Sequence, residues 1–564
     1  MPRKPRIMTT PARSRLMASV RQSGTSMELA VRKMISDLGF DYETNAKDLP
    51  GSPDLVNREA KWAILVHGCF WHAHEGCDRW KIPRSNQAFW RRKFSDNRRR
   101  DKLKIDNLEK LKYSVFIIWG CQLEDEKRLK ETIQSFLQPY KSPNNQKTPE
   151  SGKGISEEYN YSKEGKFVFR TVSLANGKRV STGILRRTTD LCEDARSAFY
   201  YAFLRKRRRF PQPKSSDCVR GVDLFCSCGG LSLGAMEAAR AIGKRFIPIA
   251  AVDNDPVAIK VYEQNFPGSK TYTLDISKAL DGSFGSEPTV NEQDFLRDVK
   301  DVRITLAGPP CQGYSSLNNH TRLKDDRNAL YERVARFVEL VRPEHVLIEN
   351  VATVIHGREG AVQKSIKEIR ELGYTVDSDI VNLASIGVPQ KRKRHVVVAS
   401  ASKSLSVHGV IAKYRVENES SVRWAIGDLE DETPKSGLFA PSRLSEENMK
   451  RVKYLHENDI YVLPNWLRPR CHRNGNTYPD MYGRMRLNEP AQTVTCGFQS
   501  PGQGRFVHPT RPRTLAPHEA ARLQFFPDFF DFSSVESKES LSRLIGNATP
   551  WQLSYVFCLE LLAS

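Results

Sequence analysis

Long hydrophobic runs are missing from this 564-residue sequence, because no stretch approaches the roughly 18 apolar residues that cross a membrane. The basic residues at positions 1–6 are not followed by the apolar segment of a secretory signal. The 11 cysteines also lack the dense paired spacing of a small disulfide-bonded secreted protein. These absences predict a soluble protein of the reducing cytoplasm with no membrane partner.

Acidic residues are outnumbered, with 66 Asp and Glu against 88 Lys and Arg, so the formal net charge is +22. A basic surface attracts polyanions, and nucleic acid is the commonest polyanion that proteins bind. Binding to a ribosome or to a membrane surface would produce the same overall charge. The charge therefore favours nucleic acid, and the length predicts about three to four structural units.

One short stretch places a cysteine for chemistry. Residues 302–306 are apolar and β-branched, and Gly308-Pro309-Pro310 follows them, so the sequence predicts a buried strand that ends in a stiff loop carrying Cys311. Ligands of open α/β sheets bind at the carboxyl ends of the strands, where a rigidly held Cys is placed as a nucleophile. A buried loop cysteine is the alternative, because free Cys is often buried.

Strands and helices alternate from about residue 214, which predicts a doubly wound, Rossmann-like α/β sheet. The first strand leads into the small-residue loop at 226–232, which lacks the pyrophosphate spacing of a dinucleotide fingerprint. The next two strands end near Asp253 and Asp275, where carboxylates usually hold ribose hydroxyls.

Residues 220–564 resemble the DNA cytosine-5 methyltransferases. Six motifs of that family occur in order: Asp223-Leu224-Phe225 with Gly229-Gly230, Gly308-Pro309-Pro310-Cys311-Gln312, Glu349-Asn350-Val351, Gln390-Lys391-Arg392-Lys393-Arg394, Glu519-Ala520-Ala521-Arg522-Leu523-Gln524, and Gly546-Asn547-Ala548-Thr549-Pro550. An unrelated nucleotide-binding sheet would have to carry all six by accident. Ser227, His518 and Thr549 depart from the usual residues, and none of them removes a catalytic group.

The resemblance implies a mechanism on duplex DNA. The thiolate of Cys311 would add to C6 of a flipped cytosine, because C5 is a poor nucleophile. Glu349 would hydrogen-bond N3 and the exocyclic amine, while Arg392 and Arg394 would steady the base and a nearby phosphate. S-adenosylmethionine would be held by Phe225, Gly229, Gly230, Asp253, Asp275 and Asn547. Residues 401–510 would recognise the target, with arginines available for DNA at 468, 470, 473, 484 and 486.

The N-terminal sequence carries a second set of functional residues. A helix is predicted over residues 26–39 with Ser26 as its N-cap, and a turn then delivers Asp54 beside the strand at 62–66. A carboxylate in that position can hold Mg²⁺ for phosphodiester cleavage. Downstream, Cys69, His74, Cys77 and Cys121 supply the Cys₃His set that a structural Zn²⁺ prefers. Unrelated cysteines near a polar loop are the alternative.

Residues 8–138 resemble the very-short-patch-repair endonucleases, which nick DNA at G:T mismatches. The resemblance lies in Glu28, Pro50-Gly51-Ser52-Pro53-Asp54, His67-Gly68-Cys69-Phe70-Trp71-His72, Phe89-Trp90 and Trp119-Gly120-Cys121. It implies a restriction-endonuclease-like fold with structural zinc, in which Asp54 binds Mg²⁺, His72 with Glu28 activates water and His67 assists at the phosphate. Phe70, Trp71 and Trp90 would wedge beside the mismatch. Val66 replaces the family's Thr, which leaves only its carbonyl for the metal, and Gly76 lengthens the zinc loop.

The chain is therefore expected to have six parts. They are the mismatch endonuclease domain (1–138), a linker (139–164), a hairpin-plus-helix segment (165–213), the methyltransferase catalytic domain (214–400), the target-recognition region (401–510) and the C-terminal part of the catalytic domain (511–564). The linker is rich in Ser, Asn, Lys and Pro, and Asn176-Gly177 marks the hairpin turn. The hairpin-plus-helix segment resembles small modules that lay a sheet into a DNA groove, and a spacer that decorates its neighbour is the alternative.

Together these patterns predict a bifunctional DNA enzyme that methylates cytosine and nicks G:T mismatches, with mismatch-repair proteins as candidate partners. The two activities fit because deamination of 5-methylcytosine leaves a G:T mismatch. Two alternatives remain for the N-terminal domain: a restriction nuclease that cuts unmodified duplex, and a zinc-stabilised DNA-binding module without cleavage.

Overall fold

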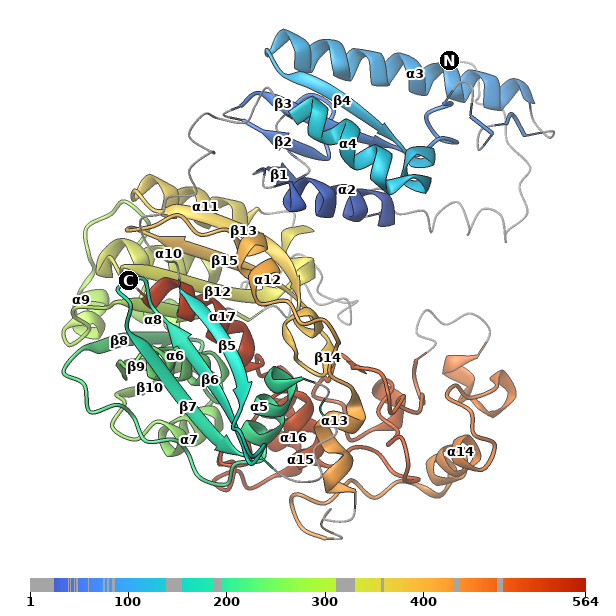
Figure 1. The fold of residues 1–564 in the computed structure, drawn as a ribbon. Helices are drawn as coiled ribbons and strands as arrows, with labels where there is room; N and C mark the ends of the chain where they lie inside the picture. The colour runs from blue at the N-terminus through green and yellow to red at the C-terminus, as the bar shows by residue number, and fades with distance from the viewer. Residues whose placement is uncertain are drawn as a thin grey trace. The chain divides into compact units, whose positions relative to one another are not determined.

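The computed structural model divides into two compact units, residues 1–150 and residues 151–564 (Figure 1). It describes residues 25–137 except 39, 41, 45, 47–48, 59, 75–76, 79–80 and 84–86; 155–310 except 187–191 and 193; 330–430 except 357–359; and 434–563 except 435 and 474–479. Within these ranges, no helix combines the length and apolar character needed to cross a membrane.

The first unit is a four-stranded sheet with helices on both faces. The strand order is β1 (Glu43–Thr44), β2 (Leu55–Asn57), β3 (Trp62–His67) and β4 (Ser114–Trp119), and only β3 and β4 are parallel. Alternation along β3 separates two cores: Trp62 and Ile64 pack with α2 (Ser26–Asp37) and α4 (Glu126–Leu137), whereas Ala63 packs with Leu108 of α3 (Gln87–Lys110). The expected N-cap Ser26 is wrong by one residue, because Thr25 caps α2 and forms a reciprocal capping box with Glu28.

The second unit is built on a seven-stranded sheet whose order is β10-β9-β8-β11-β12-β15-β13. The strands are β8 (Cys218–Leu224), β9 (Arg245–Asp253), β10 (Thr271–Thr273), β11 (Ile304–Ala307), β12 (His345–Val351), β13 (Thr375–Asn382) and β15 (Lys393–Ser400). Six of these strands run in one direction, and β15 runs antiparallel to β12 and β13 on either side of it. The order reverses between β8 and β11, which is the position where doubly wound sheets bind ligands.

Helices cover both faces of this sheet. On one face, α6 (Gly230–Ala241), α7 (Pro256–Asn265) and α17 (Trp551–Leu562) share a core with Leu347 of β12. On the other, α8 (Ile276–Ala279), α9 (Val290–Leu296), α10 (Leu330–Val341) and α11 (Ala361–Glu371) share a core with Val346 and Ile348. The expected doubly wound α/β architecture is therefore confirmed.

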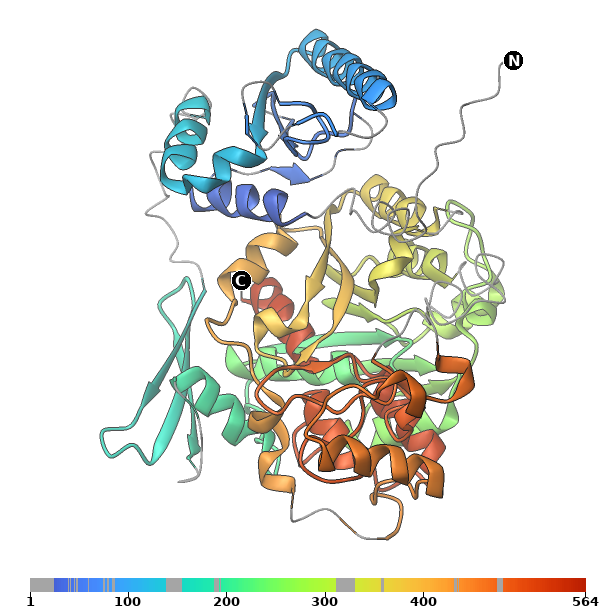
Figure 2. The same ribbon diagram turned by 90° about the vertical axis from the view of Figure 1, so that its right-hand side faces the viewer.

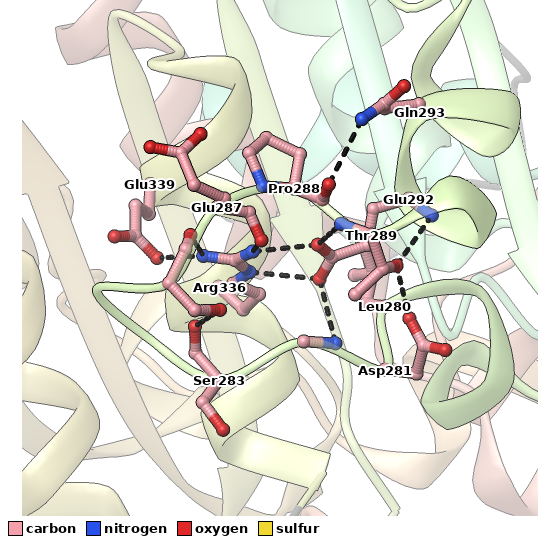
Figure 3. A network of polar contacts seen from close by, with 12 residues as sticks. Leu280, Asp281, Ser283, Glu287, Pro288, Thr289, Glu292, Gln293, Arg336 and Glu339 are labelled. Atoms are coloured by element: carbon pink, nitrogen blue, oxygen red, sulfur yellow. Dashed lines mark hydrogen bonds and ion pairs between the residues drawn. The ribbon is translucent and has the colours of Figure 1, made fainter.

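A buried ion pair fixes the loop before α9 against α10. Arg336 donates from Nε and Nη2 to the two carboxylate oxygens of Glu292, at 2.9 and 2.7 Å, and from Nη1 to Glu339 at 2.8 Å (Figure 3). Its remaining bonds go to the carbonyl groups of Ser286 and Glu287. Because every donor of this buried guanidinium has an acceptor in reach, the pair orders residues 280–289 without leaving an unpaired charge.

A three-stranded antiparallel sheet precedes β8. It consists of β5 (Ser156–Tyr161), β6 (Phe167–Ser173) and β7 (Arg179–Leu185), and α5 (Ala195–Leu204) follows it. The hairpin at Asn176-Gly177 is confirmed, with Gly177 at a φ of +81°. The expected linker over 139–164 is too long, because β5 begins at Ser156.

This small sheet and α5 belong to the second unit. Arg205 pairs with Asp428 inside the unit, and Tyr555 of α17 donates to Glu157 of β5. Part of the basic run at 205–209 is thus structural, since Arg205 is buried and Arg209 donates to the carbonyl of Asn265. These contacts therefore anchor the segment to the rest of the second unit, as the spacer alternative expected.

The region from 401 to 510 divides between two cores. Helices α12 (Val407–Lys413) and α13 (Val422–Ile426) pack into the main core, whereas α14 (Glu446–Glu457) starts a small separate core that includes Val452, Leu463 and Val507. The rest of the unit contains the two-stranded sheet of β14 (Gln390–Lys391) and β16 (Ala491–Gln492), then α15 (Pro517–Leu523) and α16 (Lys538–Asn547). Within residues 401–510 the separate small core thus begins near residue 444.

Candidate active sites

The carboxyl ends of β8 and β9 meet at one edge of the large sheet. Phe225 follows β8 in a left-handed conformation, with a φ of +59°, and Ser227 has a φ of +48°. The backbone N–H of Ser227 donates to Oδ2 of Asp253 at 2.8 Å, and the N–H of Asp255 donates to Oδ1 at 2.9 Å. Burial raises the pKa of Asp253, and these N–H bonds partly offset that effect. The loop and the carboxylate are therefore held in a fixed relation.

Other parts of the protein approach Gly229 and Gly230 so closely that a side chain at either position would not fit. A Cβ on Gly229 would lie 2.4 Å from Cε2 of Phe266, and one on Gly230 would lie 2.3 Å from the carbonyl oxygen of Thr549. Gly229 also has a φ of +94°, which favours glycine. The close approach at Gly230 brings the last motif of the chain against the start of α6.

Asp275 and Asn547 each lie at the end of a helix. Asp275 caps α8, where Oδ1 accepts from the N–H of Ser277 at 3.0 Å, and the N–H of Leu274 donates to the carbonyl of Asp253. Asn547 is the last residue of α16 and is exposed. Of the positions expected for cofactor contact, Phe225, Asp253 and Asp275 therefore lie at or just after the carboxyl ends of β8, β9 and β10.

Glu349, near the end of β12, is held by two side chains. Its Oε2 accepts from the hydroxyl of Thr549 at 2.8 Å, and its Oε1 lies 2.5 Å from Nε of Arg394. A Cβ on Gly308 would be 4.0 Å from Oε2, so the start of the Gly-Pro-Pro loop adjoins this carboxylate. Asn350 donates to the carbonyl of Pro309 at 3.0 Å, which ties the loop to β12. Cys311 lies outside the described residues.

Arg392 was expected to steady the base and a nearby phosphate, but it lies inside the folded chain. Its side chain is buried and donates to the carbonyl groups of Val494, Gly546 and Ala548, at 2.8, 3.2 and 3.3 Å. Because these carbonyl groups are far apart in the sequence, the hydrogen bonds that Arg392 donates to them join the chain segments that carry them. Of the two arginines in this motif, the one that reaches Glu349 is Arg394.

In the first unit, Asp54 lies between two strands. Its Oδ2 accepts from the N–H of Val66 at 2.7 Å, and burial together with the nearby Glu28 carboxylate raises its pKa to about 6. Glu28 is 4% exposed and its carboxylate contacts Thr25 and Arg32. Two neighbouring carboxylates, one of them hard to ionise alone, form a donor set suited to a hard divalent cation.

Two stacked histidines adjoin Asp54. The rings of His67 and His72 lie 3.9 Å apart with an interplanar angle of 9°, and burial lowers the pKa of His67 to about 3. Nδ1 of His72 lies 2.6 Å from Oδ2 of Asp101, although the sequence suggested Glu28 as its partner. Asp101 projects from the basic helix α3, so only its position in space reveals its role.

The four residues of the expected metal set converge. Each of Cys69, His74, Cys77 and Cys121 offers one ligand atom, and all four atoms lie within 4.8 Å of one another. Burial and the neighbouring thiols raise the pKa of Cys121 to about 12, so its thiolate needs a cation beside it. The His74 ring stacks on Trp119 at 4.1 Å, which fixes its orientation.

The aromatic residues expected to wedge into DNA form one cluster. Ring centroids of Phe70 lie 5.2 Å from those of Trp71 and 5.5 Å from those of Trp90, and Nζ of Lys93 lies 5.4 Å from the Trp71 ring. All three rings remain partly exposed. The cluster stands beside the basic face of α3, whose exposed arginines are at 91, 92, 98, 99 and 100.

Comparisons with known proteins cover both units. Residues 219–561 match the family model for C-5 cytosine-specific DNA methylases, and residues 6–79 match that of the DNA mismatch endonuclease Vsr. Type II methyltransferase M1.BsuMI of Bacillus subtilis is 39% identical over 406 residues, covering 72% of this chain and 95% of the relative. Type II methyltransferase M.XorII of Xanthomonas oryzae pv. oryzae is 30% identical over 370 residues, covering 58% and 81%.

The first unit has relatives of its own. Type II nicking enzyme V.XorIIP of Xanthomonas oryzae pv. oryzae is 37% identical over 131 residues, covering 23% of this chain and 96% of the relative. The chain is therefore an enzyme with two parts: it belongs to the C-5 cytosine-specific DNA methylases through residues 219–561 and to the Vsr DNA mismatch endonucleases through its N-terminal unit.

Proposed function

We propose that the second unit transfers a methyl group from S-adenosylmethionine to C5 of a flipped cytosine within a specific duplex sequence, and that the first unit nicks the G:T mismatch that deamination of the product creates. The observation that carries the proposal is that each unit gathers its reactive groups at one sheet edge. Glu349 adjoins the Gly-Pro-Pro loop in one unit, and Asp54, His67, His72 and Asp101 gather in the other.

For methyl transfer, the chain must activate the base. The thiolate of Cys311 would form a bond to C6, which makes C5 nucleophilic, and later elimination of the C5 proton would break that bond. Glu349 would hold the base at N3 and its amine, and Thr549 and Arg394 keep its carboxylate in place. S-adenosylmethionine supplies the electrophilic methyl group, and Phe225, Asp253, Asp275 and Asn547 would hold it.

Cys311→Ser tests the nucleophile. The variant should lose methyl transfer to duplex DNA and keep binding of S-adenosylmethionine, because the thiolate adds to the base and does not hold the cofactor. Isothermal titration with the cofactor and a tritium-transfer assay separate the two properties. Appreciable methylation by the variant would contradict the assignment.

For strand cleavage, the first unit needs a metal and a base. Mg²⁺ would neutralise charge that develops on the phosphate, and Asp54 with the carbonyl of Val66 would hold it. His72, oriented by Asp101, would take the proton from the attacking water. His67 is neutral near pH 7 because of its low pKa, so it can accept or donate a hydrogen bond at the phosphate without adding charge.

The Cys₃His cluster would hold a structural Zn²⁺, because four soft or borderline ligands around one point match tetrahedral zinc. Such an ion would fix the loop at 69–77 against Cys121, and this loop carries Phe70 and Trp71. Phe70 and Trp71 would then enter the base stack from a loop that is held rigidly.

A shared target supports joining the two activities. A methyltransferase and a nicking enzyme from Xanthomonas oryzae have names with the common stem XorII. Methylation marks the site where deamination generates G:T, so a nuclease that reads the same sequence meets its lesion most often. Repair proteins that act after the nick are the partners that this order of events requires.

A nicking assay tests the first unit. Duplexes with a G:T mismatch inside the methylated sequence, a G:T mismatch elsewhere, and no mismatch are compared with Mg²⁺ at fixed salt. We expect nicking mainly at the first. Cleavage of the matched, unmethylated duplex would indicate a restriction nuclease, and an absence of any cleavage would indicate a DNA-binding module.

A further inference from the structure

The three-stranded sheet of β5, β6 and β7 has two different faces. The inner face carries Val168, Val172 and Ile184, which are at most 5% exposed and pack with α5 and the main core. The register places the following side chains on the other face, here called the outer face: Glu158 and Asn160 of β5; Phe167, Phe169, Thr171 and Ser173 of β6; Arg179, Ser181 and Leu185 of β7, with Gly183 opposite Phe169. Phe167 is 42% exposed and Leu185 is 63% exposed.

Among the described residues of the second unit, no helix covers the outer face. In Figure 2 this sheet stands at the edge of the unit, and its inner side meets α5, Glu237 of α6 and Tyr555 of α17. The inner face packs on the helix layer of the large sheet, whereas the cofactor and Glu349 positions lie at the carboxyl ends of its strands. The outer face is thus separate from the candidate active site.

We propose that the outer face is a second contact surface for duplex DNA, which binds the DNA outside the base pair that is methylated. The proposal goes beyond methyl transfer and nicking, because neither activity requires this sheet. It makes the sheet an anchor that lengthens the contact of the methyltransferase with its substrate.

Exposed basic residues lie at both ends of the sheet. Lys163 and Lys166 belong to the turn between β5 and β6, and the N–H of Arg186 bonds to the carbonyl of Lys166 at that same end. At the opposite end, Lys178 lies in the turn between β6 and β7, and Arg179 is the first residue of β7. Cations at two ends of a strand can meet the two phosphate backbones that flank a groove.

The acidic residues around this face do not cancel that charge. Glu164 pairs with Lys166 at 2.8 Å and Glu158 pairs with Arg179 at 3.5 Å, and all four side chains are at least 54% exposed. Exposed pairs of this kind are worth about 1 kcal/mol or less, so phosphates can replace the carboxylates at little cost.

The middle of the outer face has the chemistry of a base reader. Thr171 and Ser181 join their hydroxyl groups across the strands at 2.6 Å, and Asn160 stands opposite Phe169 in the ladder. Hydroxyl and amide groups bond to base edges, and aromatic rings pack against thymine methyl groups. Three strands about 4.8 Å apart are roughly 10 Å wide, which fits a major groove of about 12 Å.

The charges argue against two proteins as partners of the outer face, namely the endonuclease unit and a second copy of the sheet. Residues 1–150 contain 29 Lys and Arg against 18 Asp and Glu, a net +11, so the endonuclease unit would meet a basic surface with a basic one. A second copy of the sheet would bring like charges together at both ends. Duplex DNA is the partner of opposite charge that both enzyme families already engage.

The relatives place this sheet with the methyltransferase. The match to the Bacillus subtilis methyltransferase covers 72% of the chain and is longer than the methylase region, so it extends well before residue 219. The match also spans 95% of that relative. A segment that accompanies a methyltransferase is suited to a task on the methyltransferase substrate.

Paired charge reversals test the proposal in the full chain. The variant Lys166→Glu/Arg179→Glu changes two exposed residues at the two ends of the sheet, Lys166 in the turn before β6 and Arg179 on the outer face, and each belongs to an ion pair. The matched control Lys367→Glu/Arg297→Glu changes two equally exposed, ion-paired residues on helices elsewhere in the unit. Binding to a mixed-sequence duplex is measured by fluorescence anisotropy over a salt series.

We expect the outer-face variant to bind at least about tenfold more weakly at low salt, with a salt slope reduced by about 2. The control should change binding less than about twofold. Equal losses in both variants would show a general effect of charge and would overturn the proposal. In the outer-face variant, the kcat for methyl transfer at saturating DNA should not change. The proposed methyl transfer is tested separately, because an absence of methylation by the unaltered chain would contradict the proposed function and not the DNA contact.

Photocrosslinking locates the contact. A benzophenone amino acid replaces the exposed Ser181 in one sample and Val290, which is 74% exposed at the start of α9, in the control. Irradiation with the duplex should attach DNA through position 181 and not through 290. Attachment of a second protein chain through position 181 instead of DNA would refute the proposal in favour of self-association.

Discussion

Replacing Asp54 by Asn should stabilise the endonuclease unit while it abolishes nicking. The carboxyl group of Asp54 is half-buried beside Glu28, and these surroundings raise its pKa from 3.8 to about 6. Without a bound cation, an ionised Asp54 therefore opposes folding. Asn keeps an oxygen that can accept from the N–H of Val66 at 2.7 Å, but it carries no charge.

The size of the effect follows from the pKa. An acid whose pKa is raised to about 6 in the folded state costs about 3 kcal/mol once it is ionised, and solvent access to the half-buried group reduces this to about 1–3 kcal/mol. Below about pH 3 the group is protonated in both states and contributes nothing. The cost appears as the pH rises from about 4 to 6 and is complete above that range. We therefore expect Asp54→Asn to be more stable than the natural chain at pH 7.5 and equal to it at about pH 3.

Tryptophan fluorescence can follow the unit selectively, because five of the eight tryptophans lie within residues 1–150. Thermal melts without added Mg²⁺ should show an increase of several degrees at pH 7.5. Asp96→Asn, an exposed residue of α3, is the matched control and should not shift the melt. A variant that melts at or below the natural temperature at pH 7.5, or a gain that persists undiminished at about pH 3, would refute the electrostatic account.

Three further predictions concern other groups. Asp101→Asn should reduce nicking by about 10²–10⁴-fold without affecting methylation, because His72 loses the carboxylate that orients it; rates equal to the natural chain would remove Asp101 from the site. Cys121→Ala should release zinc, measured by elemental analysis, and lower the melting temperature of the first unit while methylation persists. Thr549→Val should lower kcat for methyl transfer by about tenfold, because Glu349 loses a hydrogen bond worth about 1–2 kcal/mol; unchanged kcat would show that Arg394 alone suffices.

Local patterns in the sequence predicted much of the fold. The β-branched runs that became β8, β9, β11 and β12 are short, apolar and followed by turn residues, so their periodicity and punctuation were sufficient. Strand β5 was missed because its inward residues include Glu157 and Tyr159, which pair with polar groups inside the unit. A strand whose buried side is polar has no hydrophobic alternation to read.

Site residues were predictable where they belong to contiguous motifs and unpredictable where they depend on distant pairing. Asp101 lies among lysines and arginines of α3, so its sequence context indicates only a charged helix, and His72 is 29 residues away. Arg392 is a different case. Its motif suggests a role at the base and phosphate, which stays a prediction, and in the folded chain its guanidinium donates to the carbonyl groups of Val494, Gly546 and Ala548.

Thr549 gives a physical reason for one departure from the family pattern. A Val at this position would fill the same space but could not donate to Glu349, whereas the Thr hydroxyl does so at 2.8 Å. The same residue presents its carbonyl oxygen to the start of α6, 2.3 Å from where a Cβ on Gly230 would lie. One residue therefore contacts Glu349 through its hydroxyl and the start of α6 through its backbone carbonyl.

Covalent linkage limits how far apart the two activities can operate. Leu137 ends α4 of the first unit and β5 of the second begins at Ser156, so the chain between them can span at most about 68 Å. At 3.4 Å per base pair this distance corresponds to about 20 base pairs of duplex. Methylation and nicking on one DNA molecule by one chain therefore require nearby sites. A common recognition sequence meets that condition at every site, whereas two unrelated sequences would meet it only by chance.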